Sequence, residues 1–376
     1  MAKRPYGDHK VIFFCVGDGR KLVGRFGANP WELLYSKPEM ERIMLLLGDG
    51  GKPLLDLLAH LKLDKDNALE LLENLSSHKL VFNKEGKFFT TIPVLTRGKS
   101  MQLKRYLEPI ALREAVAIEK EMGYIKEAVL SMPFSEGFAW DDLAHIIIDA
   151  LILDLGTLNS LQLIEKEKGI YDLRTDWQKV IPFFGVENDP DSIPNLGVNS
   201  NTVDGFGLSF MHSTLFERKI DPFDVVKNER NKQLISILFE KTTPLPHLFV
   251  EVGEEPVRSL LQLNWVRRKN DEISLNLPAI RAVDREPLSK LVKKVSEGVA
   301  QAVIESIDII RQSYETLDYY SWLPGIGDYL EIVYHMLMAY TTKELVRRGL
   351  LPKIPEELPP NWSVWTWEIP WMLNFP

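Results

Sequence analysis

A similarity between two segments about 185 residues apart constrains the fold of this chain more than any single motif does. Residues 80–93 (LVFNKEGKFFTTIP) align without a gap on residues 265–278 (WVRRKNDEISLNLP), so that Pro93 falls on Pro278. This offset is close to half of the 376 residues. Two similar halves indicate a duplicated domain folded as a pseudo-dimer, because most oligomers are two-fold dimers and duplication can fuse such a pair. The alternative is two unrelated modules that each contain a hairpin and a long helix.

The composition is that of a folded intracellular protein. With 45% hydrophobic and 26% charged residues, the chain fits two or three ordinary domains. Its formal charge of -8 excludes a uniformly basic surface but leaves room for a local basic patch. Cys15 is the only cysteine, which excludes an intrachain disulfide and a cysteine-based metal site and favours the cytoplasm. The most apolar helical stretch, residues 145–158, is expected to be too short to span a membrane.

The first half, residues 1–190, combines helical spacing with turn signals. Residues 11–27 are expected to form a hairpin that turns at residues 17–19. Farther along, apolar residues at helical spacing predict three short helices, and Asp64 or Asp66 can cap the third. Gly86 then predicts the turn of a second hairpin. In order, we expect helices at 39–47, at 53–61 and from 64 or 66 onward, a hairpin at 80–92, and helices within 101–155, the first kinked at Pro109.

Three short helices followed by a hairpin is the element order of a winged helix. Residues 38–93, with the phrase LLENLSSHKLVFNKEGKFFTT, resemble the winged helix-turn-helix domains of bacterial transcription regulators, in the broad sense of the ArsR and MarR families. The resemblance implies that the third helix enters the DNA major groove. It also implies that the hairpin, called the wing, contacts the DNA backbone or minor groove.

The second half, residues 191–376, repeats this plan, and the boundary is expected within the polar residues 187–207. A winged helix is expected at about 222–278, with one helix from Pro222 to about Glu240. Its remaining elements are expected at 244–252, 256–263 and 265–277, followed by helices within 287–348 (287–314 and 329–348). The tail, residues 359–376, holds four tryptophans and should pack onto the fold. The expected class is therefore α+β, mostly helical, with two winged-helix modules each followed by long helices.

The two modules differ in their fitness for DNA, because binding needs Lys and Arg against phosphates. The third helix of the first module carries Asp64, Asp66, Glu70 and Glu73, which phosphates would repel. The second module is better equipped. The candidate DNA-binding residues are Arg258, Gln262, Arg267, Arg268 and Lys269, together with Lys84 and Lys87 on the first wing. Three alternatives remain: both modules bind DNA, only the second binds, or neither does and both are interaction scaffolds. A solvated hairpin tip would also explain residues 267–269.

A candidate polar cluster comes from the apolar helices. His145 and Asp149 are four residues apart and share one helix face, and the repeat places Glu331 and His335 at the matching positions. If the two helices pack about a pseudo-two-fold axis, these four side chains form a buried cluster that is structural or ligand-binding, because buried charges must be paired. A His145–Asp149 pair that satisfies itself is the alternative. No metal site is expected, because no second histidine is near in sequence.

No catalytic constellation or cofactor motif is present, since the P-loop, dinucleotide and GxSxG patterns are all absent. The sequence therefore favours a winged-helix DNA-binding transcription regulator that is not an enzyme. An effector pocket is expected between the long helices, with Tyr319, Tyr320, Trp322 and the terminal tryptophans as candidate lining. The alternatives are a winged-helix interaction scaffold that binds no DNA and an enzyme with an unrecognised site. Expected partners are DNA and an unknown small-molecule effector, without a membrane, for either a pseudo-symmetric monomer or a homodimer.

Overall fold

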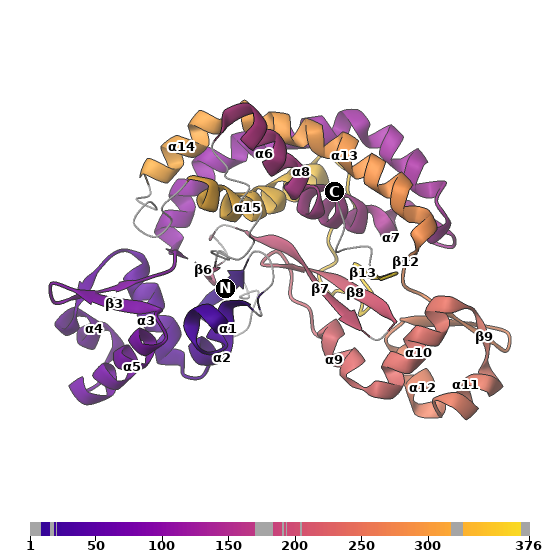
Figure 1. Cartoon of the computed structure of the whole chain (residues 1–376), viewed down its shortest axis with the longest axis horizontal. Coiled ribbons are helices and arrows are strands. Elements are labelled where there is room, and N and C mark those ends of the chain that lie inside the picture. Colours follow the sequence, from indigo (N-terminus) through magenta and orange to yellow (C-terminus); the bar gives the residue numbers. More distant parts are fainter. Residues whose placement is uncertain are drawn as a thin grey trace. The chain divides into compact units, whose positions relative to one another are not determined.

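The computed structural model describes residues 9–15, 19, 21–169, 183–189, 192, 194–203, 205–316 and 326–369. Helices account for 59% and strands for 17%, so the expected α+β, mostly helical class is confirmed. Figure 1 shows the elements in chain order. Predictions on Gly17, Asp18, Tyr319, Tyr320, Trp322 and Trp371 lie outside the described residues.

The chain forms two compact units, each built from three segments. The first unit comprises Met1–Ile110, Ile164–Pro194 and Ile304–Leu337, and the second comprises Ala111–Leu163, Asn195–Val303 and Met338–Pro376. Neither unit coincides with residues 1–190 or 191–376, because long helical segments of each half are grouped with the other half's module.

The first unit contains three helices and a hairpin where the sequence predicted them. Asp64 caps the third helix, since its Oδ1 accepts a hydrogen bond from Asn67 N at 2.9 Å. The hairpin and a short strand form a sheet of order β2-β4-β3. Pro53 belongs to that short strand and not to the following helix. The elements are α3 (Pro38–Gly48), β2 (Lys52–Pro53), α4 (Leu54–Leu61), α5 (Lys65–Ser77), β3 (Val81–Lys84) and β4 (Lys87–Thr90).

The N-terminal hairpin expected at residues 11–27 is wrong. β1 (Val11–Cys15) is followed by α1 (Lys21–Phe26), and the antiparallel partner of β1 is β6 (Phe183–Glu187). The reason lies in α1, where Leu22 and Phe26 are both buried and are spaced four residues apart, as a helix requires. This sheet has the order β1-β6-β5. The unit also contains α2 (Pro30–Tyr35), β5 (Val94–Leu95) and α14 (Ile307–Thr316).

The second unit contains the module expected at about 222–278, and Figure 1 shows its helices gathered beside β9. The single helix expected from Pro222 to Glu240 is two helices. Asn228 separates them, because its side chain accepts hydrogen bonds from Arg230 N and Asn231 N and so starts a new helix. The elements are α9 (Pro222–Lys227), α10 (Glu229–Glu240), β9 (Thr243–Pro244), α11 (Leu245–Glu251), α12 (Glu254–Gln262), β10 (Val266–Lys269) and β11 (Glu272–Leu275).

A four-stranded sheet of order β12-β13-β8-β7 completes the strands of the second unit. Much of the polar stretch at 187–207, expected to be a boundary, is instead β7 and the start of β8, and the central residues of β7 are exposed. The tail packs as expected, because Trp365 and Trp367 of β13 are buried. The strands are β7 (Leu196–Val203), β8 (Phe206–Ser213), β12 (Ala279–Ile280) and β13 (Val364–Trp367).

The long helices differ from expectation mainly at their ends. α6 begins before Met101, and the helix expected from Pro287 to about Tyr314 starts earlier and is split into α13 and α14. Pro109 lies inside α6. The remaining helices are α6 (Arg97–Leu130), η1 (Pro133–Ser135), α7 (Trp140–His145), the π-helix η2 (Ile146–Leu155), α8 (Thr157–Lys168), α13 (Ala282–Ile304) and α15 (Ile326–Arg347).

The apolar helix is longer than the sequence indicated. Helical structure continues over Trp140–Lys168, which is 29 residues and enough to cross a membrane by length and composition, so the expectation of a short helix is wrong. However, 73% of its most apolar window is buried inside the protein. Such burial is typical of a core helix and is compatible with a soluble protein.

The backbones of the two wings share their unusual conformations. Lys79 and Asn264, which precede the hairpins, both have φ of 57°. At the hairpin turns, Glu85 and Asn270 have φ of 54° and 57°. Non-glycine residues rarely adopt this left-handed region, so its recurrence at aligned positions is a specific similarity between the two hairpins.

Each module also connects to its neighbouring strand in the same way. In the first unit Gly185 N donates to Pro93 O at 2.9 Å, and in the second Thr366 N donates to Pro278 O at 2.9 Å. The strand that follows each of these prolines pairs in parallel with β6 or β13. A glutamate at the end of that partner strand then caps the long helix: Arg97 N donates to Glu187 Oε2 at 2.6 Å, and Ala282 N donates to Glu368 Oε2 at 2.8 Å.

Candidate functional site

The first wing places its candidate residues at an exposed tip. Lys84 and Lys87 face each other in the strand register, and both are exposed. On the same face, Phe82 and Phe89 stack with ring centroids 5.3 Å apart, and Phe82 is 43% exposed. This wing therefore presents an aromatic pair beside a lysine pair.

The third helix of the first module, α5, remains acidic in the folded protein. Asp66, Glu70 and Glu73 are all exposed. Lys37 offsets only part of this charge, because its Nζ lies 3.4 Å from Glu70 Oε1 in an exposed ion pair. A phosphate backbone would meet net negative charge along this helix.

In the second module, carboxylates neutralise two of the predicted DNA-binding arginines. Arg258 pairs with Glu254 at 2.5 Å, and Arg268 pairs with Asp271 at 3.1 Å. Gln262 is exposed at the end of α12. These arginines would have to give up an ion pair to reach a phosphate.

Arg267 and Lys269 keep their charge available. They alternate with Arg268 along β10 and so lie on the opposite face of the strand. Lys269 stands opposite Glu272 in the register, but within the described part of the chain it makes no ion pair. Arg267 Nε donates to Ser274 Oγ at 3.2 Å. Among the described residues, the terminal nitrogens of Arg267 have no hydrogen-bond partner.

Gly137 leaves room for the Arg267 guanidinium. A Cβ atom at position 137 would lie 2.9 Å from Arg267 Nη2 and 3.0 Å from Nη1. Gly137 has φ of +82°, which a residue with a side chain rarely adopts. The turn after η1 thus brings bare backbone against the wing arginine.

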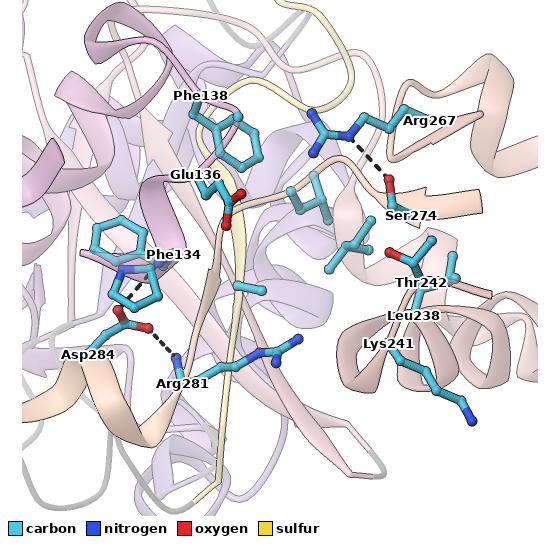
Figure 2. Close-up of a pocket in the computed structure, with 15 residues that line it drawn as sticks. Phe134, Glu136, Phe138, Leu238, Lys241, Thr242, Arg267, Ser274, Arg281 and Asp284 are labelled. Carbon is cyan, nitrogen blue, oxygen red and sulfur yellow. Dashed lines mark hydrogen bonds between the residues drawn. The ribbon is translucent and has the colours of Figure 1, made fainter. Parts of the chain in front are cut away.

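Arg267 lines a cavity of about 480 Å³ in the second unit. Figure 2 shows Glu136 and Phe138 on one side of this cavity and Arg267 with Ser274 on the other. The lining comes from four separate segments: Pro133, Phe134, Glu136, Gly137 and Phe138; Leu238, Lys241 and Thr242; Arg267, Ser274, Leu275 and Leu277; and Ala279, Arg281 and Asp284. This cavity is not the pocket predicted between the long helices.

Asp284 fixes one wall of the cavity. It is buried, and its two carboxylate oxygens accept hydrogen bonds from Arg281 N at 3.0 Å and Phe134 N at 3.3 Å. Burial raises the pKa of Asp284, although these two bonds and the charge of Arg281 oppose the rise. The carboxylate therefore ties η1 to the start of α13 and is committed to structure.

The predicted His145–Asp149 pair is present and complete within the second unit. His145 Nδ1 lies 2.7 Å from Asp149 Oδ2, and Thr342 Oγ1 donates to the other oxygen, Oδ1, at 2.7 Å. His145 Nε2 lies 3.0 Å from Pro352 O, which can only accept, so Nε2 carries a hydrogen. Asp149 lies in the π-helix η2, a rare structure that is frequent at functional sites.

The other two members of the predicted cluster lie in the first unit. His335 Nδ1 is 2.9 Å from the backbone oxygen of Glu331, one helical turn earlier.

In the second unit, burial lowers the pKa of His145, but the hydrogen bond and charge of Asp149 and the bond to Pro352 outweigh burial and raise the pKa overall. His145 and Asp149 therefore have hydrogen-bond partners in each other, Thr342 and Pro352, and need no further charged side chain.

Sequence reasoning also missed the buried carboxyl group of Glu114. Glu114 of α6 is buried, and Thr341 Oγ1 donates to its Oε2 at 2.5 Å. Within the described residues, Glu114 Oε1 has no hydrogen-bond partner. Burial raises the pKa of Glu114 to about 7, and the bond from Thr341 only partly opposes this. Its position between Ile110 and Ile118 at helical spacing is the sequence signal that could have located it.

Comparison with protein-family models, with curated proteins and with solved structures found no match to this chain.

Proposed function

We propose that this protein is a cytoplasmic winged-helix transcription regulator that binds DNA mainly through its second wing. The observation that carries the proposal is the exposed face of β10, where Arg267 and, nearer the turn, Lys269 retain their charge along the hairpin. A wing in this position supplies cations to the sugar-phosphate backbone, and such contacts provide most of the non-specific affinity for DNA.

The first module contributes less in this proposal. Its acidic α5 is repelled by phosphates, so only Lys84 and Lys87 at the wing tip support a contact. In this proposal Arg258 and Gln262 of α12 contact a base edge in the second module, which requires Arg258 to release Glu254.

We also propose that the two modules arose by duplication within the chain. The support is the agreement at aligned positions: the helix-hairpin order, the left-handed residues before and within each hairpin, and the hydrogen bonds made by Gly185 and Thr366. An experimental structure tests this. Residues 80–95 should superpose on residues 265–280 with Pro93 over Pro278, and a different path of either hairpin would end the idea.

A scaffold that binds another protein is the second candidate. The acidic α5 favours it, as does exposed apolar surface on the first module, where Leu55 is 77% exposed and Phe82 is 43% exposed. The DNA-binding measurement below separates the two candidates.

Replacing Arg267 and Lys269 together by alanine is expected to weaken DNA binding and flatten its salt dependence. Each lost phosphate contact lowers the slope of log affinity against log salt concentration by roughly 0.9, so the double variant should lose about 1.8. Arg268→Ala should change the slope less, because Asp271 already neutralises that arginine. Fluorescence anisotropy on labelled duplex DNA at several salt concentrations measures the slope.

Lys290→Ala is the matched control, because Lys290 is an exposed lysine paired with Glu286 on α13, away from the wing. It should leave the slope unchanged. An unchanged slope in the double variant would make the wing tip a solvated turn. Absence of binding by the unaltered protein at low salt, across promoter fragments from its own genome, would favour the scaffold.

A further inference from the structure

We propose that the cavity at the base of the second wing binds an organic carboxylate with an apolar body. This inference does not rest on DNA binding, because it concerns a cavity inside the second unit and is tested without DNA.

The anion-binding group is Arg267. Its Nε donates to Ser274 Oγ at 3.2 Å, and its head group lies against the bare backbone of Gly137, where a Cβ atom would come within 2.9 Å of Nη2 and 3.0 Å of Nη1. Within the described residues the two terminal nitrogens have no other partner. A guanidinium whose terminal nitrogens lack a hydrogen-bond partner can donate to the two oxygens of a carboxylate.

The rest of the cavity suits an apolar body. Its volume of about 480 Å³ lies in the usual range for small-molecule sites, and the cavity is partly open to solvent with a lining that is both polar and apolar. Buried leucines and partly or fully buried aromatic rings supply the apolar walls: Phe134, Phe138, Leu238, Leu275 and Leu277.

The charges around the cavity favour a ligand with negative charge. Three cations line it, namely Lys241, Arg267 and Arg281, against the carboxylates of Glu136 and Asp284. Asp284 is buried and bonded to two backbone N–H groups, so Glu136 is the only exposed carboxylate in the lining. Arg281 is also partly committed, because its Nη2 donates to Phe239 O at 2.5 Å. Among the described residues, Arg267 and Lys241 are the lining cations whose terminal nitrogens have no partner, and Figure 2 shows Lys241 pointing away from Arg267 and Glu136. Arg267 is therefore the cation that faces Glu136 across the cavity.

Isothermal titration calorimetry on the full chain tests the ligand class with probes that share one phenyl group. 3-Phenylpropanoate should bind, whereas the uncharged 3-phenylpropanamide and the cation 2-phenylethylamine should bind at least about tenfold more weakly. Lack of any heat from 3-phenylpropanoate up to about 10 mM would overturn the proposal. Equal or tighter binding of the amine or the amide would also overturn it.

Three variants locate the site. Arg267→Ala should weaken binding of 3-phenylpropanoate by about tenfold, and Glu136→Gln should strengthen it about twofold. Arg268→Ala is the matched control, because this arginine lies on the other face of β10 and pairs with Asp271, so affinity should not change. Weakening by Glu136→Gln would mean that Glu136 does not oppose the charge of the bound probe, and would overturn the charge argument for this site. An unaffected Arg267→Ala variant would place the probe elsewhere. Both substituted residues are exposed, and an unchanged melting temperature checks that each variant remains folded.

Discussion

Replacing Asp149 by alanine is expected to lower the free energy of unfolding by about 3–5 kcal/mol. Asp149 is fully buried and accepts hydrogen bonds on both oxygens, from His145 and from Thr342. Alanine removes the carboxylate and leaves a buried imidazole and a buried hydroxyl without their acceptor. Removing one partner of a buried pair is more damaging than removing both, because the remaining polar group has already lost its water.

Asp149→Asn separates the loss of charge from the loss of hydrogen bonds. The amide oxygen still accepts from Thr342, and the amide N–H can donate to Nδ1 of a neutral His145 whose Nε2 hydrogen faces Pro352. We therefore expect a smaller loss than for alanine. The pKa of His145 is raised in the folded protein, so its contribution to stability is fully present below the unfolded pKa and is lost as pH rises through the folded pKa. The asparagine variant should lose this pH dependence.

Chemical denaturation at several pH values measures both effects. Asp141→Ala is the matched control, because Asp141 is an exposed aspartate in the first turn of the same helix, where a charge contributes at most about 1 kcal/mol. If Asp149→Ala matched this control, the pair would be incidental to the core.

The helices and hairpins of the two modules could be predicted because their signals are local. Asp64 caps α5 through a bond to a residue three positions later, and Gly86 takes φ of +78° in the wing turn. The alternation and helical spacing of apolar residues located the other elements of each module to within a few residues. Errors at helix ends, such as the early start of α13, arose where Asp284 caps a helix without an obvious sequence motif.

The pairings of β1 and β13 could not be predicted, because they join distant residues. β1 pairs with β6, and β13 joins the tail to β8 and β12. A strand as short as β12 (Ala279–Ile280) has no periodicity of its own, and its partner is found only when the chain folds. The division into compact units has the same origin, since it depends on how long helices pack and not on local sequence.

For the candidate site, the sequence located single residues but not their surroundings. Arg267 was identified as a cation on a wing, and the structure adds that Ser274 orients it and Gly137 gives it space. The cavity was not foreseeable, because its lining comes from segments separated by more than a hundred residues. Conversely, the sequence predicts Arg258 and Arg268 as DNA-binding cations, but each forms an ion pair with a carboxylate within four residues. Helix and turn spacing could have indicated these ion pairs.

Replacing Glu114 by glutamine is expected to remove a large part of the pH dependence of stability. Burial raises the pKa of Glu114 from 4.5 to about 7, so the folded protein holds this proton over a pH range in which the unfolded chain has released it. The folded state is then favoured by protonation, and stability falls as pH rises between these two values. Above pH 7 the full cost of keeping the ionised carboxylate buried is about 3 kcal/mol.

The measurement compares how much the free energy of unfolding changes from pH 5 to pH 8 in the unaltered protein and in Glu114→Gln. The glutamine amide does not titrate, so its variant lacks the contribution of this carboxyl group. The unaltered protein should lose about 2–3 kcal/mol more over this range than Glu114→Gln does. Absolute stability at pH 5 can be lower in the variant, since the new amide N–H group has no acceptor where Oε1 is unpartnered among the described residues. Glu127→Gln, an exposed glutamate on the same helix, should keep the unaltered slope. Equal slopes in all three proteins would mean that Glu114 is ionised in the fold at neutral pH, with a counter-charge or water reaching its second oxygen.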